Sequence, residues 1–343
     1  MRAIVQTGAN SVEVQERERP SPADDEALVR VHSAGLCGSD AHAYQYEGGY
    51  EWVALPRIMG HEYSGEVVEV GREVTSVEPG DEVVEEPVHD CGDCFQCKNG
   101  QANVCRNVSI SGMHCDGGYA DFVAVDAGHL HRVPDEVQLA HAGLTEPTSV
   151  AARAVFTRSN VQAGQTVLVE GPGPIGVLVA SIADSIGANV LVSGLETDAE
   201  YRLPLVDELG IDTVDAQTAD LAAERDDFTD GYGFDAVFDT TGHHSGIETA
   251  VEQVRRGGEV VIVGLPGDPS ELSVAPIVRG EMVLNTSYGS TWRNFEQALG
   301  LMRTRSIDFD AIADTSYDVS DPETAFEAFL RSETCKPVFR FGG

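Results

Sequence analysis

A glycine-rich turn between a strand-like and a helix-like segment constrains the fold of this chain more than any other feature. The turn is Gly171-Pro172-Gly173-Pro174-Ile175-Gly176, with an apolar strand-like stretch at 166–170 before it and an apolar helix-like stretch at 175–186 after it. In this context the pattern G-x-G-x-x-G is typical of a dinucleotide-binding βαβ unit. Gly171 permits the tight turn, Gly173 lets the backbone approach a pyrophosphate, and Gly176 lets the helix pack on the strand. Pro174 and Ile175 complete the turn at the helix start, where backbone N–H groups bind phosphates.

Strand-like and helix-like segments alternate on both sides of this turn. Apolar strands are expected at 189–193, 234–238 and 259–263, and their alternation with helices is typical of a doubly wound parallel sheet. The first 150 residues instead contain short alternating strands and turns, which indicate a β-barrel-like lobe. A final strand at 337–341 is expected to return to that lobe. We therefore predict an α/β protein in which residues 1–150 and 285–343 form a barrel-like domain and residues 151–284 form a Rossmann domain.

The charge balance excludes two classes of partner. The chain has 57 acidic and 22 basic residues and a formal net charge of −35. Nucleic acids and anionic membrane surfaces are polyanions, so neither is an expected partner. No apolar run approaches the roughly 20 residues that span a bilayer, and the N-terminal residues lack the apolar stretch of a signal peptide. We expect a cytoplasmic protein.

The acidic residues are spread along the whole chain, and only Lys98 and Lys336 are lysines. This pattern favours adaptation to high intracellular salt; an acidic surface that binds a basic partner is the alternative. Below roughly 0.5 M salt, carboxylates repel one another with less screening, so activity and then the fold should be lost. Melting temperatures that do not change between low and molar KCl would contradict this expectation.

Four of the seven cysteines lie within fifteen residues, at Cys91, Cys94, Cys97 and Cys105. Four thiolates at this spacing can close a tetrahedron around Zn²⁺, and a site with no open position is structural. An iron–sulfur cluster also takes four cysteines, but nothing else in the sequence indicates electron transfer.

A second group of metal-ligand residue types lies earlier in the chain, in the segments Gly35-Leu36-Cys37-Gly38-Ser39-Asp40-Ala41-His42 and Gly60-His61-Glu62, with Thr145-Glu146-Pro147 further on. Together with the four cysteines and the glycine turn, these segments resemble the zinc-dependent medium-chain alcohol/polyol dehydrogenase family, in its sorbitol and threonine dehydrogenase branch. The resemblance covers essentially the whole chain. It implies a GroES-like catalytic domain and a Rossmann domain.

The resemblance also implies roles for individual residues. Cys37 and His61 would be catalytic zinc ligands, with either Glu62 or Glu146 as the third. Ser39 would take the substrate's hydroxyl proton by a hydrogen bond, and His42 would pass it toward solvent. The expected cofactors are two zinc ions per subunit and NAD or NADP, and the subunits would form a homotetramer or homodimer.

Cofactor choice depends on the end of the second Rossmann strand, where an acid usually binds the ribose of NAD. Here that position is Gly194, which permits NADP. Glu196 could take over the hydrogen bond to the ribose, and Arg202 is the nearest cation that could pair with the 2′-phosphate of NADP. We therefore expect both cofactors to be used, with a preference for NAD.

The expected substrate is a small molecule, a secondary alcohol of a polyol, sugar or related compound. Sorbitol itself is in doubt, because Ser287 stands where an arginine precedes the tyrosine in sorbitol dehydrogenases. Threonine 3-dehydrogenase or simple alcohol dehydrogenase activity is the alternative. A catalytically inactive NAD(P)-sensing zinc protein is a more distant one.

Overall fold

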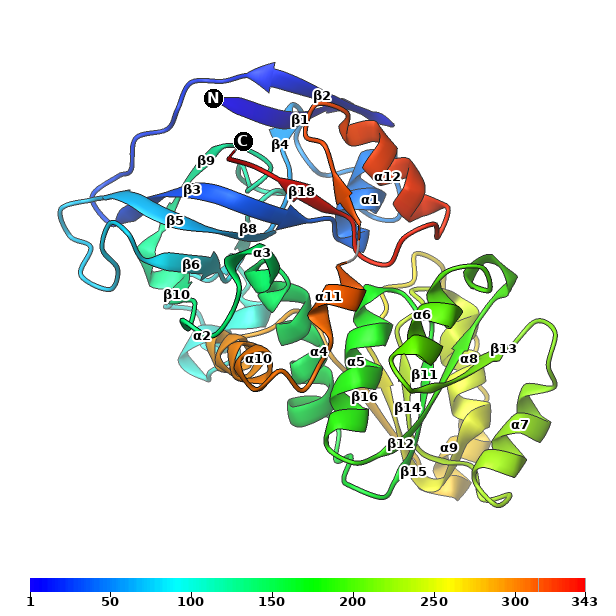
Figure 1. The fold of residues 1–343 in the computed structure, drawn as a ribbon. Helices are drawn as coiled ribbons and strands as arrows, with labels where there is room; N and C mark the ends of the chain where they lie inside the picture. The colour runs from blue at the N-terminus through cyan, green and yellow to red at the C-terminus, as the bar shows by residue number, and fades with distance from the viewer. Residues whose placement is uncertain (314, 343) are drawn as a thin grey trace.

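The computed structural model describes residues 1–313 and 315–342, which form two lobes (Figure 1). One lobe contains both termini and is built on β-strands. The other is a parallel sheet covered by helices. This arrangement confirms the predicted α/β fold, with a GroES-like domain and a Rossmann domain.

The Rossmann sheet has six parallel strands in the order β13-β12-β11-β14-β15-β16. The central strands β11 and β12 carry short apolar runs, Val167-Leu168-Val169 and Val190-Leu191-Val192, which suit a sheet that is covered on both faces. The chain order places β11, β12 and β13 on one side of the sheet and β14 to β16 on the other, so the strand order reverses beside β11. The strands are β11 Thr166–Glu170, β12 Asn189–Gly194, β13 Asp212–Asp215, β14 Phe234–Asp239, β15 Val254–Ile262 and β16 Val283–Thr286.

Helix α5, Pro174–Ser185, follows β11 directly and begins at the glycine turn. Pro174 occupies the first turn, where its missing N–H costs nothing. Gly171 adopts φ +95°, and a Cβ on Gly176 would collide with the Gly171 carbonyl oxygen, so both glycines are required by the turn. The other helices of this lobe are α6 Arg202–Glu208, α7 Leu221–Phe228, α8 His244–Gln253 and α9 Val274–Gly280.

The barrel-like lobe is built on a seven-stranded sheet with β3 at its centre (Figure 1). The C-terminal strand β18 pairs antiparallel with β3, Val338 opposite Gly35, so the chain end returns to the first lobe as expected. A small sheet, β2-β1-β4, lies beside it. The strands are β1 Arg2–Gly8, β2 Ser11–Glu16, β3 Glu26–Gly35, β4 Arg57–Ile58, β5 Glu62–Val70, β6 Glu82–Glu85, β9 Phe122–Asp126, β10 Leu130–Arg132, β17 Ser316–Tyr317 and β18 Val338–Arg340. Helices α1 Gly38–Gln45 and α12 Pro322–Leu330 complete this part of the lobe.

A short hairpin and helix carry the four clustered cysteines. Strand β7 (Val88–His89) pairs antiparallel with β8 (Ser109–Ile110), and the long loop that joins them contains α2 (Phe95–Lys98). The same loop also contains a 3₁₀ turn at Ala102–Val104.

Two packed helices connect the lobes: α4, Thr145–Arg158, and α10, Trp292–Thr304. The expected boundary at 150 lies inside α4, and the one at 284 lies inside β16. Two shorter helices, α3 Leu139–Ala142 and α11 Phe309–Ile312, lie close to this junction. Within the described ranges, every helix is too short or too polar to cross a bilayer.

Candidate active site and metal centres

The four clustered cysteines converge on one point. The Cys94 and Cys97 sulfurs are 3.3 Å apart, the Cys94 and Cys105 sulfurs are 3.8 Å apart, and the Cys105 and Cys91 sulfurs are 3.6 Å apart. Sulfurs bonded to zinc at ~2.3 Å in a tetrahedron would be about 3.8 Å apart. Backbone N–H groups of Cys97 and Arg106 lower the pKa of Cys94 to about 6. The cluster therefore fits a zinc ion with four protein ligands and no open position, which is a structural site.

A second possible metal-ligating group forms where the two lobes meet. Ligand atoms of Cys37, His61 and Glu62 all lie within 4.8 Å of one another. Cys37 lies between β3 and α1, directly before the helix, and His61 immediately precedes β5. Because β3 and β5 are adjacent antiparallel strands, these two residues from separate segments are brought to the same end of the sheet.

Asp40 lies beside the imidazole of His61. The Oδ1 atom of Asp40 lies 3.5 Å from His61 Nδ1, and the Tyr119 hydroxyl and the Cys37 N–H donate to Oδ2 at 2.8 and 3.2 Å. Burial by itself lowers the pKa of His61, but Asp40 and Cys37 outweigh it and raise that pKa well above its usual value. Asp40 Oδ1 and His61 Nδ1 form an ion pair and not a hydrogen bond. Nδ1 faces the Asp40 carboxylate and Nε2 faces the cavity, and a carboxylate behind the imidazole is common for metal-ligating histidines. The sequence analysis missed Asp40, although it lies three residues after Cys37, inside the segment that carries the resemblance.

Glu62 is held by Lys336. The Lys336 Nζ donates to both carboxylate oxygens of Glu62 at 2.7 Å and to the Leu36 carbonyl at 3.0 Å. The side chains are 0% and 1% exposed. The Glu62 carboxylate is therefore already neutralised by a buried cation 274 residues away in the sequence. The sequence analysis did not assign Lys336 a role.

Glu146, the other candidate third ligand, lies in the first turn of α4. Burial, outweighing the nearby charge of His61, raises the pKa of Glu146 to about 7. Its side chain lines a cavity of about 420 Å³ together with Cys37, Ser39 and His61.

Ser39 and His42 occupy different positions relative to this cavity. The Ser39 hydroxyl lies 3.4 Å from His61 Nε2, inside the cavity. His42 is exposed on α1, outside the cavity wall, and its ring stacks on Tyr50 with centroids 5.9 Å apart. Ser39 thus lies in the cavity with Cys37 and His61, and His42 lies at the protein surface.

A second cavity, of about 510 Å³, lies at the glycine turn. Its walls include Gly171, Gly173, Gly194 and Arg202. Thr240 lines both this cavity and the one that holds Cys37, and Ile175 at the start of α5 lines the latter. The two cavities are therefore neighbours, arranged as an extended dinucleotide would require, with one end at the glycine turn and the other beside Cys37.

After β12, the acidic residue that lines the cavity is not the one expected from the residue spacing. Glu196 is exposed and outside the cavity wall, whereas Asp198 is 7% exposed and lines it. Arg202 also lines the cavity, but its guanidinium donates to the carbonyls of Phe329 and Thr334 at 3.2 Å and lies 3.5 Å from Asp198. The sequence analysis missed Asp198.

Gly194 itself is tightly packed. A Cβ at this position would lie 2.9 Å from Leu203 and 3.1 Å from Pro172. An aspartate introduced at Gly194 would therefore disturb packing as well as charge.

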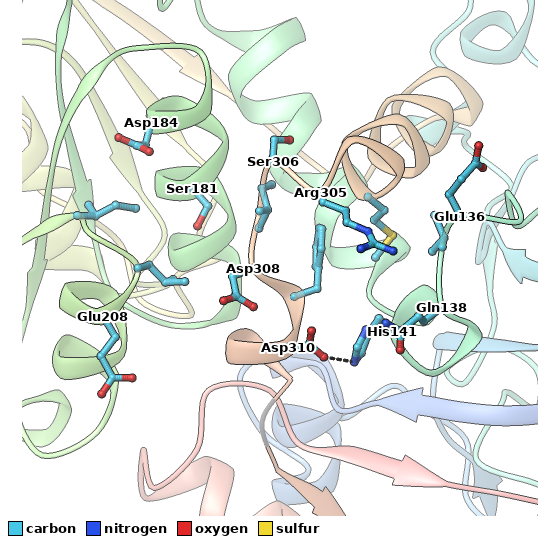
Figure 2. Close-up of a pocket in the computed structure, with 16 residues that line it drawn as sticks. Glu136, Gln138, His141, Ser181, Asp184, Glu208, Arg305, Ser306, Asp308 and Asp310 are labelled. Atoms are coloured by element: carbon cyan, nitrogen blue, oxygen red, sulfur yellow. Dashed lines mark ion pairs between the residues drawn. The ribbon is translucent and has the colours of Figure 1, made fainter.

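A third cavity, also of about 510 Å³, lies between α5 and α6 on one side and α3, α10 and α11 on the other (Figure 2). Carboxylates surround it, and His141 Nε2 is paired with Asp310 at 3.1 Å. It contains none of the residues predicted for the site. Its labelled lining residues are Glu136, Gln138, His141, Ser181, Asp184, Glu208, Arg305, Ser306, Asp308 and Asp310.

Comparison with known proteins finds two family models that match this chain. Residues 23–135 match the family model "Alcohol dehydrogenase GroES-like domain", and residues 174–304 match "Zinc-binding dehydrogenase". The sorbitol dehydrogenase of Halalkalibacterium halodurans is 33% identical over 341 residues, 98% of each chain.

Two solved structures with bound cofactor are also similar. A putative zinc-binding dehydrogenase from Sinorhizobium meliloti bound to NADP has a TM-score of 0.88 and 27% identity, covering 99% of this chain and 98% of that one. An alcohol dehydrogenase from Escherichia coli complexed with NADH has a TM-score of 0.91 and 27% identity, covering 99% of both chains.

The fold, the four-cysteine cluster and the Cys/His/Glu group define a zinc-dependent NAD(P) dehydrogenase that acts on alcohols or polyols. The chain belongs to the zinc-binding medium-chain dehydrogenase family.

Proposed function

We propose that this protein oxidises a secondary alcohol of a polyol, sugar or related hydroxylated small molecule and transfers the hydride to NAD(P)⁺. The observation that carries the proposal is the adjacency of two cavities. One holds Cys37, Ser39, His61 and Glu146, the other is formed at the glycine turn, and Thr240 lines both. A substrate in the first cavity would therefore be next to the nicotinamide end of a cofactor in the second.

Individual roles follow from the contacts. Cys37, His61 and Glu146 would hold the catalytic zinc, because Lys336 already neutralises Glu62. A zinc ion bound there would act as a Lewis acid and lower the pKa of the alcohol. Ser39 would accept a hydrogen bond from the substrate hydroxyl inside the cavity and would give up its own proton as it takes the substrate's, and exposed His42 would exchange the relayed proton with solvent. Asp40 would keep His61 in the orientation that presents Nε2.

The cofactor turn comprises Gly171, Gly173, Pro174, Ile175 and Gly176, and the ribose end lies near Gly194, Asp198 and Arg202. Relatives are solved with NADP and with NADH, and both cofactors are proposed here with a preference for NAD. The support for NAD is that the carboxylate of Asp198 lines this cavity, while Arg202 is engaged by backbone carbonyls.

The more distant alternative, a catalytically inactive NAD(P)-sensing zinc protein, is disfavoured because Cys37, His61 and Glu146 line one cavity. Threonine 3-dehydrogenase and simple alcohol dehydrogenase activities remain the competing reactions. Turnover on a panel of polyols, aldoses, sugar acids, threonine and short alcohols, with each cofactor, separates these possibilities.

We also propose that residues 1–150 and 285–343 form the catalytic domain, with residues 151–284 forming the cofactor domain.

Strand β16 is an edge of the Rossmann sheet and its Val283 is 48% exposed. An exposed apolar edge strand can pair with another chain, which supports a homodimer or homotetramer. Light scattering on the purified protein would test this proposal by measuring how many subunits associate.

The metal content is a first test. We expect two zinc ions per subunit in active protein, with mild chelation removing the catalytic ion first, because its site lies in an open cavity and has one position free. Activity should fall as this first zinc is lost and return when zinc is added. Elemental analysis that finds one zinc per subunit in fully active protein would contradict the catalytic assignment.

The ribose end of the cofactor cavity gives a second test. We expect Asp198→Asn to raise kcat/KM for NADP relative to NAD by about 5- to 10-fold, on the order of 1 kcal/mol for a charge removed beside a solvated phosphate. Asparagine keeps an oxygen that can accept the Leu195 N–H, which Asp198 accepts at 3.1 Å. The control is Glu196→Gln, an exposed acid outside the cavity. A cofactor ratio that changes in the Glu196 variant and not in the Asp198 variant would show that the ribose contact is misassigned.

A further inference from the structure

The part of the substrate cavity wall that the structure describes, which includes Cys37, carries no lysine or arginine side chain. The part of the wall away from the cofactor is apolar or aromatic, and includes Tyr50, Trp52, Val88, Ile110 and Met113. A negatively charged group on a substrate would therefore find apolar, hydroxyl-bearing or metal-ligating side chains on this wall, and no lysine or arginine among the described lining residues.

The nearest buried cation is not available to a ligand. Lys336 lies behind Glu62, is 1% exposed, and directs its Nζ to the Glu62 carboxylate and the Leu36 carbonyl. If Cys37 and Glu146 hold a divalent zinc ion, as proposed above, their two negative charges balance that ion. A carboxylate or phosphate on the substrate would then lose its hydration without gaining a cationic partner, which is costly.

One polar group on the wall has no partner. The Ser287 hydroxyl is buried, with the residue 4% exposed, and its Oγ has no hydrogen-bond partner in the structure. Ser287 follows β16 and lines the cavity. A buried polar atom without a partner calls for an explanation. A serine hydroxyl can both donate and accept, which suits an uncharged hydroxyl group better than an anion that can only accept.

From these observations we propose that the cavity selects uncharged hydroxylated substrates and excludes those carrying a carboxylate or phosphate. Ser287 Oγ hydrogen-bonds a second hydroxyl, adjacent to the carbinol that is oxidised. This inference rests on the proposed dehydrogenase function and narrows its substrate class to neutral diols and polyols. It excludes threonine, sugar acids and sugar phosphates.

Matched substrates test the selection by charge. Sorbitol and 2,3-butanediol would be compared with sorbitol 6-phosphate, gluconate and threonine, using the zinc-loaded protein and both cofactors. We expect kcat/KM to favour the best compound without a charged group over each compound that carries a carboxylate or phosphate by at least about 100-fold. The preference should persist in molar KCl, where the Debye length is roughly 3 Å, because it comes from the cavity wall and not from the net charge of the chain.

Two variants locate the selection in the cavity. Ile110→Lys places a cation on the half-buried wall and should raise kcat/KM for gluconate or sorbitol 6-phosphate relative to sorbitol by about 10-fold, whereas the uncharged control Ile110→Met should not change this ratio. Ser287→Ala should weaken the apparent binding of the diol, raising its Michaelis constant by roughly 10-fold. The Michaelis constants for the mono-alcohol butan-2-ol and for the cofactor should stay unchanged.

The outcomes are distinguishable. If no alcohol in the panel is oxidised by zinc-loaded protein, the proposed function fails and this inference fails with it. If alcohols are oxidised but an anionic compound equals or exceeds its neutral counterpart, only the inference on charge is overturned. If Ser287→Ala raises the Michaelis constant for the cofactor instead of that for the diol, Ser287 serves the nicotinamide and its assignment to the substrate is overturned.

Discussion

Replacing Cys37 by serine is expected to lower kcat on the order of a thousandfold or more, because the loss of a thiolate ligand removes the metal's charge stabilisation from the reacting oxygen. The fold should persist, since Cys37 lies at the edge of the cavity and the variant keeps the residue's size. The measurements are kcat, zinc content by elemental analysis, and the melting temperature.

Cys115→Ser is the matched control. Cys115 is a half-buried cysteine outside both metal-ligating groups, and its sulfur contacts Ser109 Oγ and the Ile110 carbonyl at 3.9 Å. This variant should keep its activity and two zinc ions. If Cys37→Ser retains near-normal turnover, or if the two variants lose activity equally, Cys37 is not a catalytic ligand.

Replacing Lys336 by methionine is expected to destabilise the protein by about 3–5 kcal/mol, the usual cost of removing one partner of a buried ion pair. The reason is that Glu62, 0% exposed, would keep its carboxylate without the Lys336 Nζ that donates to both of its oxygens. Urea unfolding would measure the loss in the free energy of unfolding, and the zinc content would be measured separately. Glu62→Gln in the same chain should recover much of it by removing the unpaired charge.

The only other lysine in the sequence provides the control. Lys98 is 63% exposed and lies 3.5 Å from Asp93, so Lys98→Met should change stability by no more than about 0.5 kcal/mol. A Lys336→Met protein as stable as the Lys98→Met protein would contradict a structural role for the buried pair. Failure of Glu62→Gln to restore stability would show that the loss has another cause.

The parts of the site that could be predicted from sequence are those encoded over short spacings. The glycine turn, the four cysteines and the Cys37–Ser39 segment each lie within one local stretch, where residue type and spacing determine which atoms can meet. The return of the chain end to the first lobe was also predictable, because 337–341 is an apolar strand that needs a sheet to pair with.

The supporting contacts were not predictable, because they join distant parts of the chain. Lys336 meets Glu62 only when β18 pairs with β3 and β3 with β5. Asp40 reaches His61 only once α1 and β5 are placed at the same end of the barrel. After β12, counting residues favoured Glu196, but the 3₁₀ turn at Glu196–Asp198 leaves Glu196 exposed and buries Asp198 in the cavity wall.

The most direct test of the central claim is a single spectroscopic assay of NAD(P)⁺ reduction by a neutral polyol or diol. It uses the zinc-loaded protein, the same protein after mild chelation, and the chelated protein after zinc is returned. Reduced nicotinamide should accumulate in the first sample, not in the second, and again in the third. Accumulation that is unaffected by removal of the catalytic zinc, or zinc-loaded protein that binds cofactor yet reduces none with any alcohol, would contradict the central claim.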